Sequence, residues 1–285
     1  GGGIYLNSNA TLKLGDGVKI TGNKGYVPVG DDTSQGGGVW VGSGAKLFIY
    51  GTAVIGDNGS HSQAAKNTAF ANKAGYGGGI YTWGYVYIGY DSFDESRGTG
   101  NPKSCSGGIW YNYAKWGGGI YCANGVAGLP GGTVRMKNGY ISYNGSNSNG
   151  GGITLAAGAN KLSILGGTIA NNETAGSGGA ILAAKTFELS VRIPSGTATK
   201  KNDIFLLIDD TNTPQIKVLS NSLGGSGRIL LTGSPTFYNE TTPYTALIDS
   251  TGELSNVSGA CYSFDVADYN SKTWKVDTTG KIKKQ

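Results

Sequence analysis

Short runs in which apolar residues alternate with other residues recur along the first two thirds of the chain. Each run contains two apolar residues two positions apart: Leu12/Leu14, Leu47/Ile49, Val86/Ile88, Val134/Met136, Leu162/Ile164 and Phe187/Leu189. Alternation with a period of two over so few residues predicts a strand with one buried face. Helical periodicity is nearly absent, so the pattern predicts an all-β chain built from many short strands.

Two motifs accompany each run and divide the chain into units. A glycine triplet and an apolar residue precede the run, starting at Gly1, Gly36, Gly77, Gly117 and Gly150, and in reduced form at Gly178. An Ile-x-x-Asn motif follows it, at Ile20–Asn23, Ile55–Asn58, Ile109–Asn112, Ile141–Asn144 and Ile169–Asn172. The sixth unit has Ile193-Pro194 instead and lacks the motif. We therefore expect three strands in each unit: one after the glycines, one at the run and one ending at the asparagine.

A unit of three short strands cannot bury its apolar face alone, whereas stacked units, about 4.8 Å apart, pair their backbones with the units above and below. The expected fold is a single-stranded parallel β-helix, a solenoid. Asparagine tolerates the left-handed conformation of a sharp corner, and stacked asparagines bond to one another. We therefore expect one internal corner ladder and place the glycine triplets at the other corner, where φ is positive or layers approach closely. The ladder comprises Asn23, Asn58, Asn112, Asn144 and Asn172.

Composition changes near residue 185. Of the 52 glycines, 44 lie in residues 1–184 and 8 in residues 185–285, while charged residues number 20 in the first part and 21 in the second. We divide the chain into glycine-rich coils at 1–184 and continuing irregular coils with a C-terminal β cap at 185–285. A separate β domain after residue 184 is the alternative. Because the chain opens inside a repeat, we expect it to be a fragment of a longer protein.

The repeat resembles a known class of proteins. GGGIY, an apolar strand and an Ile-x-Gly/Tyr-Asn corner are similar to the surface β-helix repeats of bacterial adhesin-like proteins, including polymorphic outer-membrane-protein passengers and glycine-rich repeat proteins of spirochaetes. The likeness covers residue 1 to about residue 190, across six units. The resemblance implies a right-handed β-helix displayed outside a bacterial cell, with a structural or adhesive role. No apolar stretch of 18 residues is present, so membrane attachment is expected only through regions outside this chain.

Charge and cysteine spacing exclude several functions. The net charge of +5 comes from scattered lysines, whereas nucleic-acid binding needs a clustered basic face. The three cysteines show no zinc-binding spacing. Cys105 and Cys122 are interpreted either as inert buried thiols or as a disulfide, and Cys261 stands alone. We expect no metal site and no cofactor.

Catalysis is the alternative function, since many β-helices cleave polysaccharides. A lyase or hydrolase of this type would show a groove lined by at least two carboxylates from neighbouring coils. The acidic residues of the first six units lie in loops without a common register, and the adjacent acids Asp31-Asp32 and Asp209-Asp210 are typical of solvated loops. A cation held by Asp91, Asp94 and Glu95 is a further alternative, and His61 has no plausible partner. We therefore expect no catalytic residues and no enzyme.

Aromatic residues concentrate between residues 76 and 121. The alternation Tyr81, Trp83, Tyr85, Tyr87 places four rings on one side, and Tyr85 and Tyr87 point away from the core because Val86 and Ile88 point into it. Together with Trp110 and Tyr111 on the next strand of the same coil, they form the candidate binding surface, with a glycan or a surface protein as partner. The other reading, which we favour, is that these rings pack beneath the insertion at 91–106.

Overall fold

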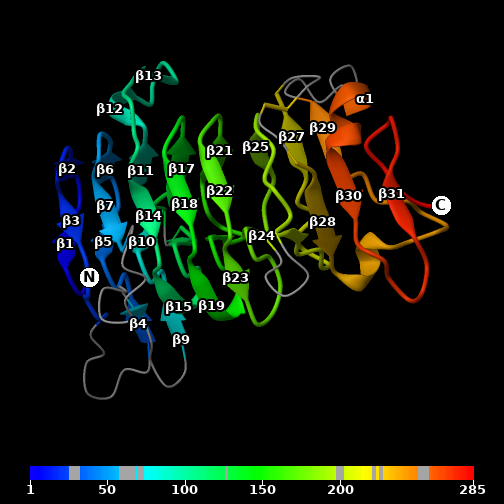
Figure 1. Ribbon diagram of the computed structural model, residues 1–285, viewed down its shortest axis with the longest axis horizontal. Helices are drawn as coiled ribbons and strands as arrows, with labels where there is room; N and C mark the ends of the chain where they lie inside the picture. The colour runs from blue at the N-terminus through cyan, green and yellow to red at the C-terminus, as the bar shows by residue number, and fades with distance from the viewer. Residues whose placement is uncertain are drawn as a thin grey trace.

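The computed structural model describes residues 1–25, 33–57, 68–69, 74–125, 128–196, 202–219, 223–224, 227–249 and 257–285 (Figure 1). Short strands dominate the described chain, and four parallel sheets, which we call A to D, run along the long axis of the molecule. The prediction of an all-β chain is therefore confirmed, with long parallel sheets as its framework.

Sheets A and B extend through most of the described chain, and successive units contribute neighbouring strands. Sheet A contains β1 (Ile4–Leu6), β5 (Val39–Val41), β10 (Ile80–Thr82), β16 (Ile120–Cys122), β20 (Ile153–Leu155), β24 (Ile181–Ala183), β26 (Ile204–Leu206), β28 (Ile229–Gly233) and β30 (Phe264–Val266). Sheet B contains β2 (Thr11–Leu14), β6 (Lys46–Ile49), β11 (Tyr85–Ile88), β17 (Thr133–Met136), β21 (Lys161–Ile164), β25 (Phe187–Leu189), β27 (Ile216–Val218) and β29 (Leu247–Asp249).

Sheets C and D are shorter. Sheet C contains β3 (Lys19–Ile20), β7 (Val54–Gly56), β14 (Gly108–Trp110), β18 (Tyr140–Ser142) and β22 (Thr168–Ala170). Sheet D contains β4 (Thr33–Gln35), β9 (Ala74–Tyr76), β15 (Tyr113–Trp116), β19 (Gly145–Asn149) and β23 (Glu173–Thr174), and β8 (Thr68–Ala69) also pairs with β15.

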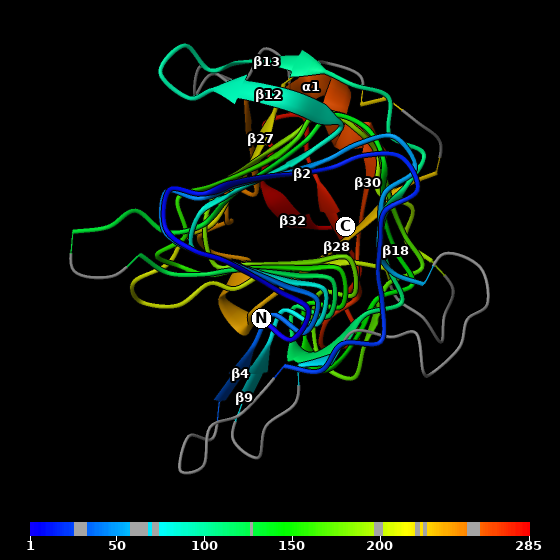
Figure 2. The same ribbon diagram turned by 90° about the vertical axis from the view of Figure 1, so that its left-hand side faces the viewer.

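Each of the first five units passes through the sheets in the order A, B, C, D, so their paths superimpose when viewed along the stack (Figure 2). The sequence predicted three strands per unit and missed the strand in sheet D. Segments such as Tyr113–Trp116 and Gly145–Asn149 share no apolar alternation, because they do not face the main core.

The apolar positions of the repeats form in-register columns within one continuous core. These columns include Ile80/Ile120/Ile153 in sheet A, Val86/Val134/Leu162 in sheet B and Ile109/Ile141/Ile169 in sheet C. Every member is at most 1% exposed. Since burial of one such side chain contributes roughly 1.5–3 kcal/mol, contact between units rather than strand propensity holds the stack together.

The glycine triplets provide backbone freedom and close approach, as the unit starting at Gly117 illustrates. Gly117 has a φ of +62°, a conformation that L side chains rarely adopt. A Cβ on Gly118 would lie 2.0 Å from the carbonyl oxygen of Gly145, and one on Gly119 would lie 2.6 Å from that of Gly152. Any side chain at these positions would therefore push neighbouring units apart.

The same contacts correct the predicted arrangement of corners. Gly145 directly follows the ladder residue Asn144, and a Cβ on Gly119 would lie 3.0 Å from the Asn144 side-chain nitrogen. The triplets and the asparagines therefore meet at one corner instead of two. The sheet D segment of each unit leaves the core at this corner and returns to it.

Asparagine side chains form a ladder at this corner. Asn112 donates from Nδ2 to Oδ1 of Asn144, Asn144 donates to Asn172, and Asn172 donates to Asn202, at 3.0, 3.0 and 3.3 Å. Of the other predicted members, Asn58 lies outside the described residues, and Asn23 donates to the carbonyl oxygen of Thr21. Asn202 is a member that the motif search missed, because Pro194 and an insertion separate it from Ile193.

The predicted backbone role of these asparagines is wrong. The left-handed conformation belongs to the residues before Asn112, Asn144 and Asn172, with φ values of +53° at Tyr111, +57° at Tyr143 and +55° at Asn171. The ladder asparagines bond backbone groups with their side chains instead. Their function at the corner is hydrogen bonding, not tolerance of positive φ.

Sheets A and B continue without a break across residue 185, and sheets C and D end at β22 and β23. The later strands therefore share the core of the first ones. At the end of the described chain, β31 (Trp274–Val276) and β32 (Ile282–Lys284) form an antiparallel hairpin whose Trp274 and Ile282 are buried. A short helix α1 (Val257–Ala260) and the 3-10 turns η2 (Pro235–Phe237) and η3 (Cys261–Ser263) complete this region.

Candidate functional site

The predicted ring surface at Tyr85 and Tyr87 is covered by the protein itself. An antiparallel hairpin, β12 (Tyr90–Asp94) and β13 (Thr99–Pro102), folds from the end of β11 over the outer face of sheet B. Tyr87 is 0% exposed and stacks between Phe48 and Phe93, with ring centroids 4.7 and 5.0 Å away. Tyr85 is half-buried beside it. The rings form a small second core, which leaves no open platform at Tyr87.

Trp110 and Tyr111 do not join this cluster. They lie at the end of β14 in sheet C, whereas Tyr85 and Tyr87 belong to sheet B. Trp110 packs against Tyr140 with ring centroids 5.3 Å apart, and Tyr111 stacks on Tyr143 at 4.9 Å. The four residues proposed as one binding surface therefore occupy two separate faces.

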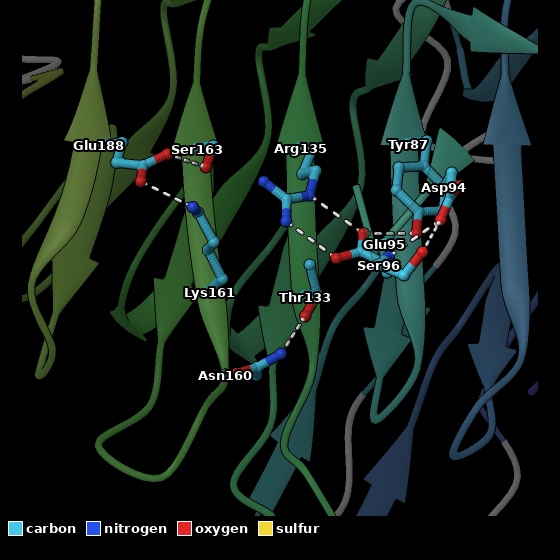
Figure 3. Close-up of polar contacts among 10 residues, drawn as sticks. All are labelled: Tyr87, Asp94, Glu95, Ser96, Thr133, Arg135, Asn160, Lys161, Ser163 and Glu188. Atoms are coloured by element: carbon cyan, nitrogen blue, oxygen red, sulfur yellow. Dashed lines mark hydrogen bonds and ion pairs between the residues drawn. The ribbon is translucent and has the colours of Figure 1, made fainter. Parts of the chain in front are cut away.

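One glutamate fixes the hairpin to sheet B. Glu95 lies in the turn between β12 and β13, and its carboxylate accepts hydrogen bonds from Nε and Nη2 of Arg135 at 3.1 and 2.9 Å and from the hydroxyl of Tyr87 at 2.7 Å (Figure 3). The Arg135 guanidinium also lies 4.7 Å from the Phe93 ring centroid. Partial burial disfavours the charged form of Glu95, but the bonds from Arg135 and Tyr87 outweigh it and lower the pKa of the carboxyl.

The acidic residues of this hairpin do not converge on a cation site. The Asp91 carboxylate accepts a hydrogen bond from Asn101, and that of Asp94 accepts bonds from Ser96, while Glu95 faces Arg135. Nowhere in the described residues do three metal-ligating side chains gather. The cation hypothesis for the hairpin is therefore unsupported.

A second glutamate on sheet B is also paired. Glu188 on β25 lies 2.7 Å from Nζ of Lys161 and 2.5 Å from the Ser163 hydroxyl, both on the neighbouring strand β21 (Figure 3). Burial disfavours its charged form, yet the bonds from Lys161 and Ser163 lower its pKa. A glycosidase general acid needs a raised pKa, which neither Glu95 nor Glu188 has.

A second set of aromatic residues lies on sheet A, where Tyr5 is 60% exposed and Tyr81 is buried. The second residue after the glycine triplet is aromatic in the first four units, and parallel register brings Tyr5, Trp40, Tyr81 and Tyr121 into one row. Neighbouring rings stack with centroids 4.4, 6.4 and 5.6 Å apart and interplanar angles of at most 11°. We call these four residues the aromatic row.

Trp83 forms one wall of a slot beside this row. Its ring stands nearly perpendicular to those of Trp40 and Tyr81, with centroids 5.4 and 5.7 Å away. The loop between β16 and β17 places Leu129 and Pro130 beside these rings, and Leu129 is 52% exposed. The slot has a volume of about 240 Å³ and is lined by Tyr5, Ser8, Trp40, Ser43, Trp83, Leu129 and Pro130.

The slot offers two kinds of contact. Its rings and Leu129 give an apolar surface against which the C–H groups of a flat ligand can pack, and the hydroxyls of Ser8 and Ser43 offer hydrogen bonds. None of the residues described around the slot is charged. Sequence reasoning missed it by placing Tyr81 and Tyr85 on one strand, whereas the chain turns at Trp83 and Gly84 from sheet A to sheet B.

No protein-family model matches the chain, and neither a curated protein nor a solved structure matches it significantly. Within the described residues, no helix has the length and apolar character needed to cross a bilayer.

Proposed function

We propose that the chain is a right-handed parallel β-helix that acts as a non-enzymatic, adhesin-like element at the outer surface of a bacterium and binds a neutral glycan in the slot at Trp83. Repeated passage through sheets A to C around one core supports the helix. The motif resemblance supports the location and the adhesive role.

The slot is the observation that carries the binding function. Sugar rings pack their C–H faces on tryptophan and tyrosine, and the slot combines Trp83, Trp40 and Tyr5 with two serine hydroxyls. The absence of charge among the described lining residues favours an uncharged sugar. Tyr5 and Leu129 are 60% and 52% exposed, so a ligand reaches the slot from solvent without opening the core.

The enzyme alternative receives less support. Both glutamates on the outer face of sheet B are held as ion pairs, Glu95 with Arg135 and Glu188 with Lys161. A carboxylate that is hydrogen-bonded to a cation is a weak proton donor at neutral pH. This arrangement favours a structural use of both residues.

Glycan-array binding of the intact chain tests the proposal. We expect one group of neutral glycans to bind and Leu129→Asp to abolish that binding, because the new carboxylate would occupy the apolar slot. Failure of all neutral glycans to bind would refute the proposal.

A further inference from the structure

The outward positions on the strands of sheet B are mostly basic, and the acids Asp91, Asp94 and Glu95 of the hairpin lie near those on β2, β6 and β17. The outward positions of its strands carry Lys13 on β2, Lys46 on β6, Arg135 on β17, Lys161 on β21 and Lys217 on β27. Among the described strands of this sheet, Glu188 is the outward-facing carboxylate, since Asp249 points inward and is 1% exposed. Four of the scattered lysines of the sequence are thus brought onto one face, which spacing along the chain did not show.

A groove of about 430 Å³ lies on this face over β21, β25, β27 and β29. Lys161, Lys185, Glu188, Gln215, Lys217 and Ile248 contribute to its lining. Lys161 neutralises Glu188 through their 2.7 Å ion pair. Lys185 donates one hydrogen bond to the carbonyl oxygen of Ala159, and Lys217 has no carboxylate within ion-pair distance in the described chain. Two positive charges of the groove are therefore uncompensated.

We propose that this groove binds a linear anionic glycan lying along the stack, with Lys185 and Lys217 contacting its carboxylate or sulfate groups. Lys161 on β21 and Lys217 on β27 lie two strands apart, about 9.6 Å along the stack, and Lys185 precedes β25 between them, so a polymer with charges spaced along its length complements them. The apolar side chain of Ile248 and the amide of Gln215 match the mixed surface of a sugar ring.

This site does not depend on the slot. It lies on sheet B and uses charge, whereas the slot lies on sheet A and is lined by uncharged residues. Loss of one kind of binding therefore leaves the other intact, and the two proposals can fail separately.

Affinity measurements with three size-matched polymers, a polyuronate, a sulfated glycan and an uncharged glucan, test the proposal. We expect the intact chain to bind one of the two anionic polymers, or both, with an affinity that falls as salt rises, whereas any binding of the glucan should not depend on salt. Whichever anionic polymer binds identifies the carboxylate or the sulfate as the ligand group.

Two substitutions of opposite expected sign make the test specific. Lys217→Gln should weaken binding about three- to tenfold, because it removes an unpaired cation. Glu188→Gln should strengthen it about two- to fivefold, because it removes the carboxylate of the groove and releases Lys161. A general loss of folding cannot produce both results. Lys275→Gln, on the exposed side of β31, is the matched control and should change nothing.

The proposal is overturned if neither anionic polymer binds, if Lys217→Gln and Glu188→Gln both leave the affinity unchanged, or if Lys275→Gln weakens it as much as Lys217→Gln. Equal binding of a single-stranded oligonucleotide of the same charge would also overturn it, because it would show a sequence-independent attraction to any polyanion.

Discussion

The side-chain oxygen of Asn144 accepts two hydrogen bonds from Asn112, one from the backbone nitrogen and one from Nδ2, both at 3.0 Å. Asn112 uses its Nδ2 a second time to reach the carbonyl oxygen of Ile55, in the preceding unit, at 2.9 Å. One buried side chain thus links three successive units. Asn144 repeats the pattern with Ile109 and Asn172.

Substituting one ladder asparagine should therefore lower the free energy of unfolding by more than the loss of a single hydrogen bond would. Asn144→Ala removes the acceptor of the Asn112 backbone N–H and the Nδ2 donor to the Ile109 carbonyl oxygen, both in a buried site, while Asn112 Nδ2 keeps its bond to Ile55. Unsatisfied buried groups cost roughly 1–3 kcal/mol each, so we expect the free energy of unfolding to fall by at least that amount. Urea denaturation measures it.

Asn101→Ala is the control for the ladder, since within the described part of the chain the Asn101 side chain bonds only the exposed Asp91 of the hairpin. Its substitution should change the free energy of unfolding by less than about 0.5 kcal/mol. Equal effects of the two substitutions would show that the ladder bonds add nothing to stability.

The third glycine of a triplet should tolerate no side chain in the middle of the stack. A Cβ on Gly119 would lie 2.6 Å from the Gly152 carbonyl oxygen, so Gly119→Ala should destabilise the protein by roughly 1–3 kcal/mol. The chain supplies its own comparison, because Ala180 occupies the equivalent position in the sixth unit. Ala180→Gly should cost only about 0.5–1 kcal/mol, from backbone entropy. Thermal unfolding of both variants checks this difference.

The fold was predictable where one residue type performs one repeated task. Alternating apolar residues predicted the strands of sheet B, the glycine triplets marked the strands of sheet A that follow them, and Ile-x-x-Asn marked the buried Asn112, Asn144 and Asn172. The strand in sheet D escaped prediction because its buried positions, such as Ala114 and Ser146, hold small or polar residues and show no apolar alternation. Asn202 escaped because the ladder depends on spatial position, and an insertion after Pro194 changes its spacing along the chain.

The hairpin should detach from sheet B when its ion pair is removed. Arg135→Gln leaves the half-buried Glu95 without its cation, so we expect faster tryptic cleavage after Arg97 at the hairpin tip. The side chain of Arg97 is 81% exposed, so the rate is limited by backbone opening. Lys161→Gln, which breaks the other ion pair of the sheet, is the control and should leave the cleavage rate at Arg97 unchanged. A similar rise in both variants would contradict the assigned role of Glu95.

Hairpin attachment should also depend on acidity. The pKa of Glu95 is lower in the folded protein than its ordinary value near 4.3, so its contribution is complete above that value and is lost as pH falls through the folded pKa. Amide protection in β12 and β13 should stay constant from neutral pH to about 5 and decrease below about 4. Glu95→Gln should show weaker protection at neutral pH and no such decrease.

All three cysteines should behave as protected thiols. Cys105, Cys122 and Cys261 are buried and free, and burial raises the pKa of Cys105 to about 11, so little thiolate exists at neutral pH. A thiol reagent should react slowly with the native protein and with three groups after denaturation without reductant. If only one thiol reacts after denaturation, the result would instead show that Cys105 and Cys122 form a disulfide.

Neutral-glycan binding should depend on the slot. Leu129→Asp should weaken it by at least about tenfold, because the carboxylate would lose hydration beside the bound sugar. Tyr262→Asp is the control, since Tyr262 is 70% exposed and lies far along the chain near the end of sheet A. Equal binding by both variants would place the glycan elsewhere.

The candidate sites show a different limit of sequence reasoning. Outward-facing rings were correctly inferred for β11, but whether a ring meets solvent depends on where an insertion folds. The hairpin covers Tyr87, and the chain turn at Gly84 places Trp83 beside Trp40 rather than beside Tyr85. The aromatic row could have been predicted from the sequence, because an aromatic residue occupies the second position after each of the first four glycine triplets.

The ladder also determines how the molecule would respond to mechanical force. Its bonds, like those of the parallel sheets, run from unit to unit, so the interfaces carry tension in series and the weakest one opens first. Release of the unit from Gly117 to Asn149, 33 residues long, would lengthen the tether by about 110 Å. A chain built this way yields in successive steps and dissipates a pull instead of breaking at once.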